Sequence, residues 1–119
     1  MPNFLQNPLG TETAVISTGG SLSTAVNLGG LRLFGFVMPS TWTAASISFQ
    51  VSYDGGLTWS DMYDAAGEEM AASVSVARCV ILDPIDFAAV PMIRLRSGTA
   101  ATPVVQEAER AITLVLRSV

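Results

Sequence analysis

The alternation of apolar and polar residues is clearest over residues 45–53. Since successive side chains of a strand face opposite sides of a sheet, this alternation predicts a half-buried strand with an apolar inner face that extends to Tyr53. The apolar positions are Ala45, Ile47, Phe49, Val51 and Tyr53, and the intervening positions are Ser46, Ser48, Gln50 and Ser52.

The residues that follow predict a β-hairpin. Asp54-Gly55-Gly56 precedes a second strand expected at 57–63, and glycine readily adopts the positive φ that tight hairpin turns require. Other short apolar or alternating segments lie between turns rich in Gly, Pro or Asp. The strands expected from them are 13–17, 22–28, 31–38, 73–82, 92–97 and 111–118. About eight short strands at intervals of roughly 8 to 12 residues predict an all-β protein, an antiparallel β-sandwich or small barrel.

The C-terminal part of the chain fits two patterns. From Pro103, apolar residues are spaced as on one side of a helix, and proline is favoured in a first helical turn. The alternation of Ile112, Leu114 and Leu116 with Thr113, Val115 and Arg117 is stronger and predicts a strand that closes the sheet. A short helix before this strand stays an alternative.

Residues 1–12 differ from the rest, because prolines, glycine and amide residues surround Phe4, Leu5 and Leu9. We therefore expect an extended N-terminal arm over residues 1–12 and one β-sandwich domain over residues 13–119. Such an arm is either a frayed chain end or a segment that becomes ordered against a partner, with Phe4, Leu5 and Leu9 as the anchoring residues.

Composition argues against catalysis. Half of the 119 residues are hydrophobic and 13% are charged, against roughly a quarter in average globular proteins, so the surface is short of charge. The chain has six arginines but neither lysine nor histidine, which excludes a lysine Schiff base, an imidazole base and a histidine-containing zinc site. Cys79 lies in an apolar segment and is expected to be buried. We expect no enzyme activity, no cofactor and no metal.

Charge also limits the partners. A net charge of −4 disfavours a nucleic-acid groove. Arg94 and Arg96 share one face of their strand and are expected to pair with acids in the sheet or across a subunit boundary. The acidic residues around the turn after the hairpin do not match a calcium loop and are expected to face solvent. They are Asp61, Asp64, Glu68 and Glu69.

Segments that would direct the chain to a membrane or for export are not expected. No stretch approaches the roughly 20 mainly apolar residues of a membrane-spanning helix. Residues 1–10 contain no basic residue and two prolines, which is unlike a secretory signal.

The most specific local motif is Ser52-x-Asp54-x-Gly56-x-Thr58-Trp59. It resembles the Asp-box of sialidase-type propellers and of other β proteins. The resemblance implies a structural hairpin in which Asp54 satisfies backbone donors, Gly56 accepts a strained backbone and Trp59 packs beneath. A propeller needs at least four blades, which a single copy in 119 residues cannot supply.

A glycan contact is a second interpretation of the aromatic residues. Trp42 lies in the loop-like segment 40–43 and is the best candidate for an exposed aromatic ring on which a sugar could stack. Exposed aromatic residues also mark protein interfaces, so both readings stay open.

Residues 28–59, together with segments 82–84 and 93–98, resemble small β-sandwich virion proteins of tailed bacteriophages. The resemblance implies a jelly-roll-like fold and a structural role in the virion, after synthesis in the host cytoplasm. Capsid decoration, a vertex or head spike, and a fibre or tail component remain alternatives, the last with a glycan as ligand. A charge-poor sandwich suits burial against copies of itself or other virion proteins, so we expect a homo-oligomer, trimeric or pentameric on a symmetry axis.

Overall fold

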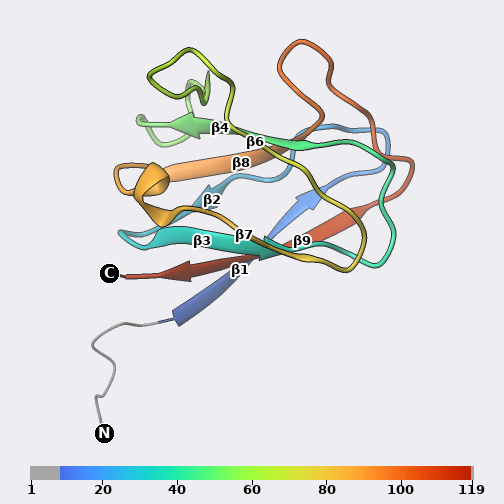
Figure 1. The fold of residues 1–119 in the computed structure, drawn as a ribbon, viewed down its shortest axis with the longest axis horizontal. Coiled ribbons are helices and arrows are strands. Elements are labelled where there is room, and N and C mark those ends of the chain that lie inside the picture. Colours follow the sequence, from blue (N-terminus) through green and yellow to red (C-terminus); the bar gives the residue numbers. More distant parts are fainter. Residues whose placement is uncertain (1–8, 119) are drawn as a thin grey trace, which may run out of the picture.

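Two antiparallel sheets stack on each other in the computed structural model, which describes residues 9–118 (Figure 1). The β9 sheet has the order β1 (Leu9–Ile16), β9 (Arg110–Arg117), β3 (Arg32–Val37) and β7 (Cys79–Ile81). The β4 sheet has the order β2 (Val26–Asn27), β8 (Met92–Ser97), β4 (Ile47–Ser52) and β5 (Ser60–Asp61), and β6 (Ala71–Ala72) also pairs with β4. The predicted all-β class with two antiparallel sheets is confirmed.

The hydrophobic core lies between the two sheets. Alternate residues of β9 point into it, and the predicted closing strand at the C-terminal end is confirmed. Phe49 of β4 meets Phe87 edge to face, with ring centroids 5.4 Å apart. The fully buried aliphatic side chains include Ile16, Leu33, Ile47, Ile93, Leu95, Ile112 and Leu114.

The longest ladder joins the two ends of the described chain. It runs from Leu9 opposite Arg117 to Ile16 opposite Arg110. The strand expected at 13–17 therefore begins at Leu9, and the last four residues of the expected arm belong to β1. Phe4 and Leu5 lie outside the described residues, so the anchoring role of Phe4, Leu5 and Leu9 stays a prediction.

Several expected strands are shorter than the sequence pattern. Segment 57–63 pairs at β5 and through a single bridge between Tyr63 and Glu69, segment 22–28 pairs mainly at β2, and segment 73–82 only at β7, while β6 was not expected. Leu57 is exposed, as is Val76. Apolar residues alone did not set the limits of these strands. A segment also needs a neighbouring strand whose edge has free backbone hydrogen-bonding groups.

Cys79 is exposed, which contradicts the expectation that it is buried. It lies on β7, at the edge of the β9 sheet, opposite Val37. Ile81 on the same strand is 79% exposed. The apolar segment around Cys79 therefore forms an edge strand. It pairs with β3 on one side and with no strand of residues 9–118 on the other.

Helical structure is limited to one 3₁₀ turn in the part of the chain that the structure describes. This turn, η1 (Pro84–Phe87), begins after Asp83, whose carboxylate accepts a hydrogen bond from the Ile85 amide. The alternative helix after Pro103 does not form. Instead the Val104 amide donates to Ser97 and the Gln106 amide donates to Gly20, so this segment bonds to its neighbours and not to itself.

Strand β4 is buried on both faces, not on one. Ser48 and Ser52 of its expected polar face are both buried, whereas Tyr53, expected on the inner face, is 68% exposed. Ser48 accepts a hydrogen bond from Arg96 and donates one to the Gly98 carbonyl. Loops therefore cover the serine side of the strand, and Tyr53 lies beyond its end.

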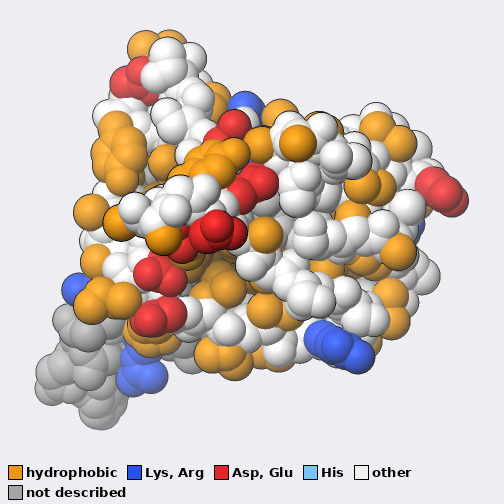
Figure 2. Space-filling model, turned by 45° about the horizontal axis from the view of Figure 1, so that its top comes forward, with side chains coloured by type: hydrophobic (Ala, Val, Ile, Leu, Met, Phe, Trp, Pro, Cys, Tyr) orange, Lys and Arg blue, Asp and Glu red, His pale blue; other side chains and the backbone are white. Residues whose placement is uncertain are grey.

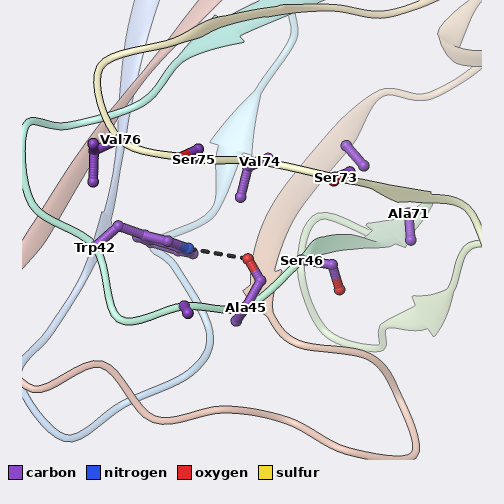
Figure 3. Close-up of a pocket in the computed structure, with 10 residues that line it drawn as sticks. Trp42, Ala45, Ser46, Ala71, Ser73, Val74, Ser75 and Val76 are labelled. Carbon is purple, nitrogen blue, oxygen red and sulfur yellow. Dashed lines mark hydrogen bonds between the residues drawn. The ribbon is translucent and has the colours of Figure 1, made fainter.

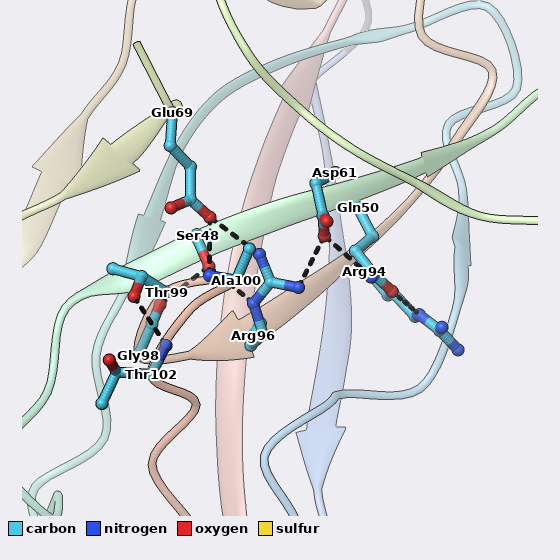
Figure 4. A network of polar contacts seen from close by, with 10 residues as sticks. All are labelled: Ser48, Gln50, Asp61, Glu69, Arg94, Arg96, Gly98, Thr99, Ala100 and Thr102. Carbon is cyan, nitrogen blue, oxygen red and sulfur yellow. Dashed lines mark hydrogen bonds and ion pairs between the residues drawn. The ribbon is translucent and has the colours of Figure 1, made fainter.

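Arg96 organises the polar layer on that covered face (Figure 4). Its guanidinium pairs with Asp61 at 2.7 Å and with Glu69 at 2.8 Å, and Glu69 also accepts a hydrogen bond from the Ala100 amide. The expected pairing of an arginine with acids in the sheet is confirmed for Arg96. The expectation that the whole acidic run only faces solvent is wrong for Asp61 and Glu69, because both compensate a buried cation.

Arg94 has a different environment. Its Nε donates to the Gln50 side chain, and its guanidinium lies 4.3 Å from the ring centroid of Trp59. A cation over an indole face is stabilised by the ring quadrupole. Arg94 therefore covers the hairpin tryptophan and has no acidic partner within residues 9–118.

Removing the Arg96 guanidinium should leave two neighbouring carboxylates without their cation. We expect Arg96→Met to lower the free energy of unfolding by about 3 kcal/mol in urea denaturation at neutral pH. Arg117→Met, at an exposed position of β9, should change it by less than about 0.5 kcal/mol. Equal effects of the two substitutions would contradict a structural role of this network.

Candidate functional site

The hairpin after β4 brings the Asp-box residues together. The Asp54 carboxylate accepts hydrogen bonds from the Thr58 amide, the Thr58 hydroxyl and the Ser52 hydroxyl. The Ser52 hydroxyl in turn accepts from the Gly56 amide at 2.8 Å. Gly56 has a φ of 94°, which a residue with a side chain rarely adopts.

Trp59 completes this hairpin by packing and not by facing a ligand. Its Nε1 donates to the Gly56 carbonyl at 3.1 Å, and Arg94 covers its ring. Hydrogen bonds from Thr58 and Ser52 hold the pKa of Asp54 down at about 2, from an ordinary value of 3.8. The hydrogen bonds among the five motif residues therefore stabilise the turn, and Arg94 of β8 packs on the Trp59 ring.

Trp42 is half-buried and packs against the core, so it is less exposed than its loop-like segment suggested. Its indole Nε1 donates to the Ala45 carbonyl at 3.0 Å (Figure 3). The ring lines a hollow of about 330 Å³ between its own loop and the segment from Ala71 to Val76. Ser46, Ser73 and Ser75 also line it, and no charged side chain does.

Gln106 holds the loop that carries Trp42. This side chain is fully buried. Its amide donates to the Thr43 carbonyl and the Ser97 hydroxyl, and its Oε1 accepts from the Thr43 amide and from Arg110. Sequence reasoning missed Gln106, because its partner Thr43 lies 63 positions away.

A second hollow, of about 340 Å³, opens beside η1. We call it the tyrosine hollow. Tyr53 and Tyr63, which are 68% and 52% exposed, lie on its wall with Asp61 and Asp86. Its remaining lining residues are Val51, Met62, Ile85, Ala88, Ala89 and Val90. Sequence reasoning missed this site because it assigned Tyr53 to the core. The position of Tyr53 directly before the Asp54 turn could have indicated that this residue lies at the end of the strand and is exposed.

The surface as a whole is poor in charge, as the composition implied. Figure 2 shows a face on which hydrophobic and uncharged side chains outnumber charged ones. Within residues 9–118, no group of three or more histidine, cysteine or acidic side chains is placed to hold a metal ion. No helix in the same residues is long and apolar enough to span a membrane.

Comparison with known protein families, with curated proteins and with solved structures finds no match to this chain.

The depressed pKa of Asp54 predicts an acid-dependent loss of stability. Because the folded state holds the proton less tightly than the unfolded state, the stabilisation is complete above pH 3.8 and is lost as pH falls toward about 2. The difference in urea stability between the wild type and Asp54→Asn should shrink over this interval.

Asp86→Asn is the control for this measurement, because the Asp86 carboxylate accepts no hydrogen bond from residues 9–118. The change in the stability difference over this pH interval should be larger for Asp54→Asn than for Asp86→Asn. A constant difference between wild type and Asp54→Asn from pH 4 to pH 2 would contradict the argument.

Proposed function

We propose that this protein is a non-enzymatic structural component of a tailed-bacteriophage virion, a capsid decoration or vertex-spike protein anchored through its N-terminal arm. The outer face of the β9 sheet is the observation that carries this proposal. Three successive rows across this face contain no charged side chain. They are Val15 with Ala111; Thr13, Thr113, Val37 and Cys79; and Thr11, Val115, Gly35 and Ile81.

An uncharged outer face suits burial against a protein shell. Covering this face removes hydroxyl and aliphatic groups from water but buries no charged group without a partner. Burial of an unpaired charge is costly. The face also contains Ile81, one of the most exposed large aliphatic side chains of the described chain. Exposed apolar area of this kind marks surfaces that contact other proteins.

The residues before β1 are the proposed anchor. Residues 1–8, with Phe4 and Leu5, precede β1, which is the edge strand of this same sheet. An apolar segment that continues from the edge of an attachment face can follow that face onto the partner. Folding on binding is a common way for such segments to form specific contacts.

We also propose that this two-sheet fold is a jelly roll, and its topology supports this. Most connections cross from one sheet to the other, and the first strand β1 pairs with the last strand β9. Double-sheet jelly rolls of this kind occur in viral capsid and lectin domains. We also include a homo-oligomer, trimeric or pentameric, since a protein on a capsid axis adopts the symmetry of that axis.

Removing the part of the arm that precedes β1, with Phe4 and Leu5, tests the anchor without disturbing the sheet. Because β1 begins at Leu9, deletion of residues 1–8 leaves the β1–β9 ladder complete. We expect this truncation to abolish co-sedimentation with capsids assembled without the protein, and to shift the melting temperature by no more than a few degrees. Undiminished attachment of the truncated protein would overturn the anchor.

A glycan-binding module of a fibre or tail is the alternative function, and the uncharged hollow beside Trp42 favours it. An aromatic ring with nearby hydroxyl groups can stack on and hydrogen-bond to a sugar. Under this alternative Trp42→Ala should abolish retention on immobilised host polysaccharide and leave capsid attachment unchanged.

The decoration proposal makes a different forecast for the polysaccharide assay and the same forecast for the capsid assay. Neither the wild type nor Trp42→Ala should be retained on the polysaccharide, and both should bind capsids equally well. Far-ultraviolet circular dichroism of the variant provides the control for folding, because Trp42 packs against the core.

A further inference from the structure

The tyrosine hollow combines aromatic faces with negative charge. The residues that line it include Tyr53, Tyr63, Asp61 and Asp86, but no arginine. Aromatic faces attract cations, and carboxylates pair with guanidinium groups by charge-assisted hydrogen bonds. The apolar residues around them suit the aliphatic stem of a long basic side chain.

The two aspartates of this hollow differ in the hydrogen bonds and ion pairs that their carboxylates already make within the chain. Asp61 accepts hydrogen bonds from Gln50 and Arg96, which lower its pKa, so it is ionised but largely compensated. Asp86 is exposed, and within residues 9–118 no side chain pairs with it. Asp86 is therefore the carboxylate that is free to bind an incoming cation.

Arg78 is an exposed arginine on a rigid turn. Its neighbour Ala77 has a φ of 58°, and no other residue except glycine has a positive φ in the described chain. The Ala77 amide donates to the Pro39 carbonyl, and the Arg78 carbonyl accepts from the Met38 amide. Backbone strain of this kind persists only where surrounding contacts impose it, and it is common at functional positions.

The other arginines are less suited to bind a second molecule. Arg94, Arg96 and Arg110 donate hydrogen bonds within their own chain. Arg32 and Arg117 face each other across β3 and β9, at the end of the β9 sheet. Arg78 has no ion pair or side-chain hydrogen bond to residues 9–118 and stands apart from that pair.

We propose that the tyrosine hollow of one copy binds the Arg78 guanidinium of a second copy, head to tail. Val76 lies close to Arg78 on its own chain, and Ile85 lines the hollow, so exposed apolar groups lie beside the charged contact on both sides. An interface with a paired charge inside an apolar surround combines affinity with a defined orientation.

The two halves of this contact are different parts of the surface, one before β7 and one beside η1 after it, as a head-to-tail contact requires. β7 and the residues after it run from the Arg78 turn to η1, which borders the hollow (Figure 1). Repetition of one head-to-tail contact closes into a ring when the rotation between copies permits it. The inference deepens the homo-oligomer part of the proposed function and is independent of attachment to a capsid.

Charge reversal in purified protein tests the contact. We expect the wild type to self-associate in sedimentation velocity, and Arg78→Glu and Asp86→Arg each to weaken the association by about 30-fold or more. The double variant with both substitutions restores an opposite-charge pair between copies, so it should recover much of the association that each single variant loses.

Matched variants control for net charge. Arg117→Glu and Glu109→Arg change the charge by the same amounts at exposed positions away from the hollow, and both should associate as the wild type does. Thermal melting should be alike for all variants, because none of these side chains is buried. Monomeric wild type at 0.1 mM, equal loss in the control variants, or a double variant weaker than both single variants would each overturn the proposal.

The outcome is separable from the capsid assay. Loss of self-association with undiminished co-sedimentation would support the Arg78 contact and leave the anchor intact. Reduced capsid binding by Asp86→Arg with normal self-association would overturn the contact and indicate that the hollow binds another virion protein.

Discussion

The packing of the two sheets through their apolar inner faces is the constraint on which the rest of this structure depends. Phe49 of β4 and Phe87 of η1 meet in the core, so the same contact that closes the sandwich also seats the 3₁₀ turn. Once η1 is held there, its outer residues border the tyrosine hollow. A feature of the surface is thus positioned by buried aromatic packing, because a dense core admits few alternative arrangements.

Buried polar groups hold the loops in position. Arg96 ties β8 to the segments that carry Asp61 and Glu69, and Gln106 ties the Trp42 loop to the other end of the chain. Each of these groups is satisfied by several hydrogen bonds, as burial of a charge or amide demands. The two hollows are therefore bordered by loops that a polar network holds in place.

The surface divides into regions of different chemistry. The outer face of the β9 sheet is uncharged over three rows and suits attachment over a broad area. The tyrosine hollow is small, acidic and aromatic, and it suits one basic side chain. The proposed function assigns the first surface to a shell and the second to a copy of the chain, since a single surface cannot be buried against both at once.

The sequence by itself determined the all-β class, the closing strand and the Asp-box hairpin, because these depend on alternation and on turn residues that are close in the chain. Only the tertiary structure decided that Ser48 is buried, that Cys79 is exposed and that Tyr53 lines a hollow. Those outcomes depend on which segments cover each sheet face and each edge. That coverage is set by contacts such as the one between Gln106 and Thr43, 63 positions apart, and local periodicity carries no information about partners so distant in the chain.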